Sequence, residues 1–209
     1  MDEYLDDQEQ WRRVIAWLRE SGPTMLAAVL IVLVGYGGWR YWQNRKTNTA
    51  LAAEGQYEQV LSALNQGNLS LGSTLADRLI KDYPNTPYAV QADLMAARVA
   101  VQNNQLADAA KRLRHVLDTT KSDAEMQLLV RLRLARVLLG QKQPDEALKL
   151  LDGVQTGAFA SRYAEVRGDA LLAKGDRAGA LQAYRSARAG ADTLDGQLLD
   201  LKIEDLARS

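Results

Sequence analysis

The side chains that could carry out catalysis are few in this sequence, and none has a spacing typical of an active site. The 209 residues include no cysteine and one histidine, His115. No set of His, Cys or carboxylate residues clusters around His115 at metal-ligand spacing, and no nucleophile-elbow, Walker, dinucleotide-binding or zinc-protease motif occurs. The sequence therefore predicts a protein that is not an enzyme and has no cofactor or metal, in which His115 is a surface or packing residue.

Composition favours a helical protein without a net charge or disulfide bonds. The chain has 26 basic and 26 acidic residues, so its formal net charge is zero and no global field points to nucleic acid. Phe and Pro are scarce while Ala and Leu are abundant, which is typical of helices. The absence of cysteine excludes a disulfide framework, and it does not distinguish cytoplasm from periplasm.

An uncharged segment, 21–39, separates a short tail from a large domain. As a helix it would span roughly 28 Å, close to the ~30 Å hydrocarbon core of a bilayer. Aromatic and basic residues follow it, as they do at a membrane interface; they are Tyr36, Trp39, Arg40, Tyr41, Trp42, Arg45 and Lys46. We predict a transmembrane helix over 21–42 that follows a tail over 1–20.

The flanks of this segment favour an uncleaved signal anchor and leave its orientation open. The preceding residues are acidic where a signal peptide would be basic, and no small-residue cleavage site follows. Three basic residues lie close to each end, so the positive-inside rule gives no direction. Small residues near one side of the helix predict contact with a partner helix; they are Ala28, Gly35 and Gly38.

The remainder of the chain reads as helices broken at regular intervals, and three segments fit one template. Ala97, Ala135 and Gly168 each begin a segment, 38 and then 33 residues apart. In each segment a turn residue follows at +7, where Gly or Asn tolerates a positive φ, and a small residue follows at +12. Large apolar residues at +16 are expected to fill the space between neighbouring pairs, and a fourth template position follows at +19. The positions are Asn104, Lys142 and Gly175 at +7; Ala109, Ala147 and Ala180 at +12; Leu113, Leu151 and Tyr184 at +16; and Val116, Val154 and Ala187 at +19. Such helix–turn–helix units of about 34 residues are tetratricopeptide repeats.

The predicted fold is therefore all-α, with one N-terminal transmembrane helix and a tetratricopeptide-like α-solenoid. We place the solenoid at 43–209, with repeats at about 47–84, 88–121, 126–159 and 160–192. An amphipathic helix over about 194–207 is expected to cover the open end of the array, as terminal caps do.

The first helices of such an array line a concave groove, and this groove is the candidate binding site. The template positions that face it are Gln91, Leu94, Arg98 and Val101, then Leu129, Leu132, Arg136 and Leu139, then Arg162, Glu165, Asp169 and Leu172. Arg98 and Arg136 are equivalent, so two guanidinium groups flanked by apolar residues could hold a polypeptide. The alternative is that these arginines pair with neighbouring acids on a solvated face.

Several segments of the chain resemble the YfgM family, the ancillary SecYEG translocon subunits of Gram-negative bacteria. The segments are Gly38-Trp39-Arg40-Tyr41-Trp42, Leu132-Arg133-Leu134-Ala135-Arg136-Val137, Arg167-Gly168 with Lys174-Gly175-Asp176, and Leu201-Lys202-Ile203. The resemblance covers essentially the whole chain and is weakest over the first twenty residues.

The resemblance implies a single-pass inner-membrane protein with a cytoplasmic N-terminus and a periplasmic solenoid. It also implies association with SecYEG and with PpiD, a membrane-anchored periplasmic chaperone, and a role in passing newly translocated, unfolded polypeptides to chaperones. Two other readings stay open from the residues alone. One is a scaffold for another envelope complex, and the other is a regulator whose acidic tail binds a cytoplasmic factor.

Overall fold

The structure is a computed structural model that describes residues 3–84 and 86–208, with the side chains of 11, 12, 15, 30–84, 86–192 and 195–208. Within these residues the chain is helical and contains no strand. The elements are α1 (Glu3–Asn65), α2 (Leu69–Asp82), α3 (Pro87–Gln102), α4 (Leu106–Thr119), α5 (Ala124–Gly140), α6 (Pro144–Leu151), the 3₁₀ helix η1 (Gly157–Phe159), α7 (Ala160–Ala173), α8 (Arg177–Ala189) and α9 (Thr193–Arg208). The chain divides into two units, Met1–Leu51 and Ala52–Ser209.

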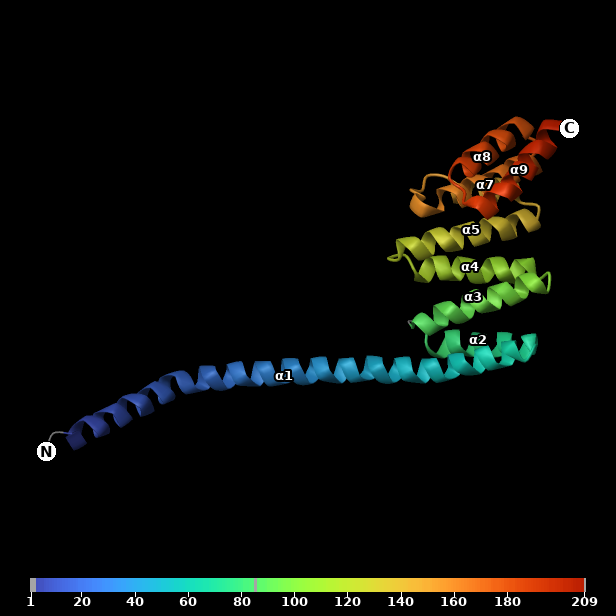
Figure 1. Ribbon diagram of the computed structural model, residues 1–209. Helices are drawn as coiled ribbons and strands as arrows, with labels where there is room; N and C mark the ends of the chain where they lie inside the picture. The colour runs from blue at the N-terminus through green and yellow to red at the C-terminus, as the bar shows by residue number, and fades with distance from the viewer. Residues whose placement is uncertain (1–2, 85, 209) are drawn as a thin grey trace. The chain divides into compact units, whose positions relative to one another are not determined.

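The second unit is a stack of antiparallel helix pairs (Figure 1). The end of α1 packs with α2, followed by the pairs α3–α4, α5–α6 and α7–α8, and α9 contacts α8. The all-α tetratricopeptide-like solenoid is confirmed. Residues of α9 share a cluster with Ala180 and Tyr184, so α9 covers the end of the stack as predicted.

Four turns inside the helix pairs have the same backbone conformation. Gly67, Asn104, Lys142 and Gly175 all have positive φ, of 75°, 58°, 60° and 85°. At each turn the next residue donates its backbone N–H to a carbonyl five residues earlier, as in Asn68 to Ala63 (2.9 Å) and Asp176 to Leu171 (3.0 Å). These are Schellman closures, which satisfy the free carbonyls of a helix end. The positive φ expected at Asn104 and Gly175 is confirmed.

Local sequence determines where several helices begin. Asn68, Thr86, Asp123 and Asp176 each accept a backbone N–H of the first turn, at 2.9 to 3.2 Å, which is the role of an N-cap. Pro87 and Pro144 occupy the first turns of α3 and α6, where a missing N–H costs nothing. Because proline cannot continue a helix but suits its first turn, the proline-containing segment after Asp82 ends α2 and begins α3.

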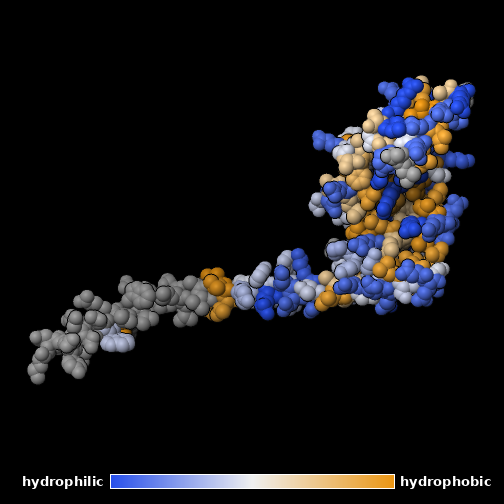
Figure 2. Space-filling model, in the orientation of Figure 1, coloured by the Kyte–Doolittle hydropathy of each residue, from blue (hydrophilic) through white to orange (hydrophobic). Residues whose placement is uncertain are grey.

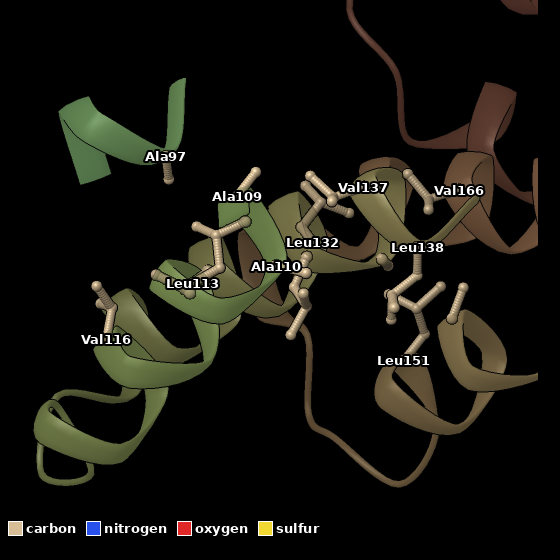
Figure 3. Packing of buried hydrophobic residues seen from close by; sticks show 14 of the residues in the cluster. Ala97, Ala109, Ala110, Leu113, Val116, Leu132, Val137, Leu138, Leu151 and Val166 are labelled. Carbon is tan, nitrogen blue, oxygen red and sulfur yellow. The ribbon is translucent and has the colours of Figure 1, made fainter. Parts of the chain in front are cut away.

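Small residues allow the helices of each pair to approach closely. Ala109, Ala147 and Ala180 are fully buried, and Gly168 lies against the Tyr184 ring. The largest cluster joins α3 to α7 through Ala97, Leu113, Leu138, Leu151 and neighbouring side chains (Figure 3). The apolar residues predicted to fill the space between neighbouring pairs therefore form a continuous core.

One helix is shorter than its repeat position predicts. The template placed Val154 in the second helix of the third pair, whereas α6 ends at Leu151. Gly153 has φ 71°, a conformation that stops a helix. Val154 lies in the segment that leads to η1 and packs against the core from there.

Within the described part of the chain, no helix combines the length and the apolar character that a membrane crossing requires. The transmembrane helix predicted over 21–42 lies partly outside that part, because the side chains of 21–29 are not described.

Candidate functional site

A groove of about 670 Å³ lies between the first helices of the second and third pairs, α3 and α5. Four of the twelve predicted groove positions line it, namely Leu94, Arg98, Val101 and Arg136. The predicted positions thus bring together side chains from two repeats, and Leu113 of α4 contributes from behind. Polar and apolar atoms are interspersed over the repeat helices, with hydrophobic surface at the level of α3 to α5 (Figure 2).

Among the other eight predicted positions, Leu132, Leu139 and Asp169 lie away from this groove. Leu132 is 2% exposed and belongs to the core, where it lies among the side chains of Figure 3. Leu139 is half-buried against the same core and does not line the groove. Asp169 accepts hydrogen bonds from α8 and α9. Placing Leu132 on the groove surface was therefore wrong, because the α5 face that carries it packs inward.

The structure adds a groove residue that the template missed. Arg133 lines the groove three residues before Arg136, on the same face of α5. Arg98 and Arg133 have no hydrogen-bond or ion-pair partner among the described residues. Arg136 pairs with Glu165 at 3.5 Å, with its side chain 50% exposed. The alternative of arginines neutralised by neighbouring acids thus holds in part for Arg136 and not for Arg98.

A network of charged residues joins α7, α8 and α9 at the end of the stack. Lys202 Nζ of α9 donates to Glu165 Oε1 at 2.9 Å and to Asp169 Oδ1 at 2.8 Å. The Tyr184 hydroxyl donates to Asp169 Oδ1 at 2.8 Å, and Lys202 lies 5.2 Å from the Tyr184 ring centroid. Burial of Lys202 alone would lower its pKa, but the hydrogen bonds to Asp169 and Glu165 outweigh burial and raise it. Burial, and then the Asp169 carboxylate, raise the pKa of Tyr184.

Beside the first helix pair the charge is negative, opposite to that of the groove arginines. The rings of Tyr57 and Tyr88 lie 5.7 Å apart, and the Tyr57 hydroxyl contacts the sulfur of Met95, a groove residue, at 3.5 Å. Burial, and then the carboxylates of Glu54 and Glu58, raise the pKa of Tyr88. These carboxylates therefore lie beside the aromatic pair that adjoins the groove.

His115 belongs to an ionic cluster between the first and second repeats, in which Asp93 and Arg112 are buried. Its Nδ1 lies 2.5 Å from Oδ2 of Asp93, which is 3% exposed. Arg112 contacts Asp93 (3.4 Å), Asp77 (2.7 Å) and Asp108 (2.9 Å). The described residues contain no group of three or more side chains arranged to hold a metal ion. Each charge in this cluster has an opposite partner, which is what buried charges require.

The candidate membrane-helix contact is only partly within the described side chains. Ala28 lies outside them. A Cβ added at Gly35 or Gly38 would meet no atom within 4 Å, so that side of α1 is open.

The fold places the chain in the tetratricopeptide class of helical-repeat proteins. The family model described as a tetratricopeptide repeat-like domain matches residues 16–208. A protein named ancillary SecYEG translocon subunit from Escherichia coli (strain K12) is 31% identical over 99% of this chain and 100% of its own length. One of the same name from Haemophilus influenzae is 27% identical over 97% and 98%. The chain belongs to this family of ancillary SecYEG translocon subunits.

A solved structure supports the fold. A fragment of MamA from Desulfovibrio magneticus RS-1, beginning at its residue 41, superposes with a TM-score of 0.57, at 16% identity, over 75% of this chain and 95% of the fragment. At that identity the likeness concerns the arrangement of helices alone.

Proposed function

We propose that this protein is a non-enzymatic inner-membrane factor that acts at the SecYEG translocon and holds a polypeptide partner in the groove between α3 and α5. The observation that carries the proposal is the groove itself, in which Arg98 and Arg136 from equivalent positions flank apolar side chains. A surface with exposed guanidinium groups and an apolar floor suits peptide recognition. The family relatives are named for the translocon, which supplies the place of action.

The same proposal gives the protein a single membrane anchor over 21–42. Its sequence carries no charge from 21 to 39. Five consecutive large apolar side chains, from Leu30 to Val34, are 54 to 73% exposed on α1, which suits contact with lipid better than with water. Just beyond them, Lys46 Nζ lies 3.8 Å from the Trp42 ring centroid, a pairing suited to a membrane interface.

In this account the tail is cytoplasmic and the domain from about residue 43 is periplasmic. There the groove receives either a membrane-anchored chaperone of the PpiD type or a newly translocated polypeptide. The open side of α1 at Gly35 and Gly38 is the proposed contact with a helix of the translocon or the chaperone.

Purification of the tagged full chain from its own membranes in mild detergent tests the proposal. SecYEG subunits and a periplasmic chaperone should copurify with it. The doubly substituted protein with Arg98→Glu and Arg136→Glu should fold and recover less of the chaperone, since both substitutions reverse exposed groove charges. A matched control, Arg114→Glu with Arg185→Glu, changes exposed arginines on the second helices α4 and α8 and should recover normal amounts.

Two results would overturn the proposal. Recovery of a different envelope complex without Sec subunits would favour the scaffold reading. Unchanged copurification by the groove variant would move the interface away from the groove.

A further inference from the structure

We propose that the groove between α3 and α5 selects an acidic segment of its polypeptide partner, in which carboxylates alternate with apolar side chains. Basic residues of the partner flank this segment on the side of the first repeat. This inference rests on the proposed function, because it names the chemistry of the polypeptide that the groove would hold.

The first argument is the charge inside the groove. The whole chain is neutral, yet the groove is lined by Arg98, Arg133 and Arg136 and by no aspartate or glutamate. Low-dielectric walls that carry one sign of charge concentrate the field and attract the opposite sign. A carboxylate is the group that a guanidinium binds with two parallel hydrogen bonds.

The second argument is the contrast with arginines elsewhere in the second unit. Arg112, Arg167 and Arg188 each pair with an aspartate of the same chain. Arg98 and Arg133 have no such partner within the described residues, although both are exposed. Their donors are therefore free for carboxylates from another chain.

The third argument is the floor between the arginines. Leu94, Val101 and Val137 line the groove, and Val101 is 43% exposed despite being apolar. A partner made only of acidic residues would leave these side chains without contacts. A strand places alternate side chains on opposite sides, and a helix places them on adjacent faces, so a segment that mixes Leu or Val with Glu or Asp can satisfy both surfaces.

The fourth argument concerns the charges at the two ends of the stack, on either side of the groove. At the α9 end, Glu165 and Asp169 are already bound by Lys202, so that end carries little free charge. At the other end, Glu54 and Glu58 lie beside Tyr57 and Tyr88. Basic residues of the partner would be attracted there, and acidic residues would be repelled. The charge pattern thus gives the bound segment a direction.

The test measures binding of fluorescent peptides to the full chain in non-ionic detergent. One peptide alternates Glu with Leu or Val over twelve residues. A second has Gln in place of every Glu, and a third has Lys there. Fluorescence anisotropy gives each dissociation constant at low and high salt. We expect the acidic peptide to bind at least about tenfold more tightly than the Gln peptide, and the difference to shrink at high salt.

Substitutions connect this binding to the groove. Arg98→Gln with Arg133→Gln should raise the dissociation constant of the acidic peptide by about tenfold or more and leave that of the Gln peptide unchanged. Arg114→Gln with Arg185→Gln is the matched control and should change neither. The far-UV circular dichroism melt of both variants should equal that of the parent, because all four side chains are exposed.

Direction is tested with two further acidic peptides that carry three lysines at either the N-terminal or the C-terminal end. One of them should bind more tightly, and the preference should disappear in Glu54→Gln with Glu58→Gln. Equal binding of the two peptides would overturn the directional part of the proposal.

Equal binding of the acidic and Gln peptides, tighter binding of the Lys peptide, or no effect of the Arg98 and Arg133 substitutions would overturn acidic selection. Vesicles with anionic lipid form the last arm. Binding to them that depends on Arg98 and Arg133, without binding of the acidic peptide, would assign the arginines to lipid instead. Failure of the proposed function is distinguishable, because it would appear as loss of Sec subunits from the copurified material whichever peptide binds.

Discussion

The Tyr184 ring occupies the space in which a side chain at Gly168 would lie. A Cβ built at Gly168 would be 2.5 Å from Cδ1 of Tyr184 and 3.1 Å from its Cζ. Gly168 itself is buried, and Tyr184 is 1% exposed. Because Gly168 of α7 has no side chain, Tyr184 of α8, the largest of the fully buried side chains, can pack against it.

Gly168→Ala should consequently destabilise the helical-repeat domain. The added methyl forces the Tyr184 ring to move within a filled core, which typically costs about 1–3 kcal/mol of unfolding free energy. Urea denaturation of the full chain followed by circular dichroism measures the change. Gly55→Ala is the matched control, because a Cβ there meets nothing within 4 Å. The control should be neutral or stabilise by roughly 0.5–1 kcal/mol through helix propensity.

The sequence template predicts this packing correctly because it relies on residue size at a fixed helical spacing. It predicts positive φ where the turn residue is Asn104 or Gly175 and offers no such signal at Lys142, which adopts φ 60° all the same. The repeated closure of the turn imposes that conformation on whatever residue stands there.

Other features escaped prediction for different reasons. Leu132 faces the core instead of the groove, and helical spacing alone does not settle how far a helix is rotated in its stack. Asp169 is bound by Lys202, which follows 33 residues later, so only the folded chain reveals the pair. The early end of α6 did have a local signal, the Asp152-Gly153 step, which the repeat alignment overrode.

Ala180→Leu should destabilise the protein by about 1–3 kcal/mol, because Ala180 is fully buried where α8 packs against its neighbours. Ala147→Leu should do the same at α6. Thermal unfolding of the full chain measures both changes, with Ala178→Leu, exposed on α8, as the control. An unchanged melting temperature for Ala180→Leu would show that the repeat register is incorrect.

Asp93→Ala should cost about 1–3 kcal/mol, since it leaves His115 without its carboxylate and removes one of three acids from the buried Arg112. Arg112 keeps Asp77 and Asp108, which limits the loss. The comparison is Asp82→Ala, which breaks an exposed pair with Arg78 and should cost no more than roughly 0.5 kcal/mol. Similar urea midpoints for the two variants would contradict this role of Asp93.

The stability of the cap should fall in alkaline solution. The folded pKa values of Tyr184 and Lys202 both lie above their ordinary values of 10.0 and 10.5. For a raised pKa the stabilising contribution is fully present below the unfolded pKa and is lost as pH rises through the folded value. The free energy of unfolding should therefore decline from about pH 10 upward.

Tyr184→Phe tests that pH dependence. It removes the phenol and its bond to Asp169, so stability at pH 7 should drop by about 1 kcal/mol while the alkaline decline becomes shallower. Tyr41→Phe changes an exposed tyrosine and should leave both quantities unaltered. If the unfolding free energy of Tyr184→Phe declined as steeply in alkaline solution, Tyr184 would not be a source of the pH dependence.

The most direct measurement of the central claim is photocrosslinking from the groove in intact membranes. A photoreactive residue at Val101, exposed within the groove, is compared with one at Ala178, exposed on the second helix α8. The account predicts crosslinks from Val101 to a chaperone or translocating polypeptide at the Sec channel, and none of these from Ala178. Equal crosslinking from both positions, or crosslinks from neither while a probe at Gly38 captures the partner, would contradict it.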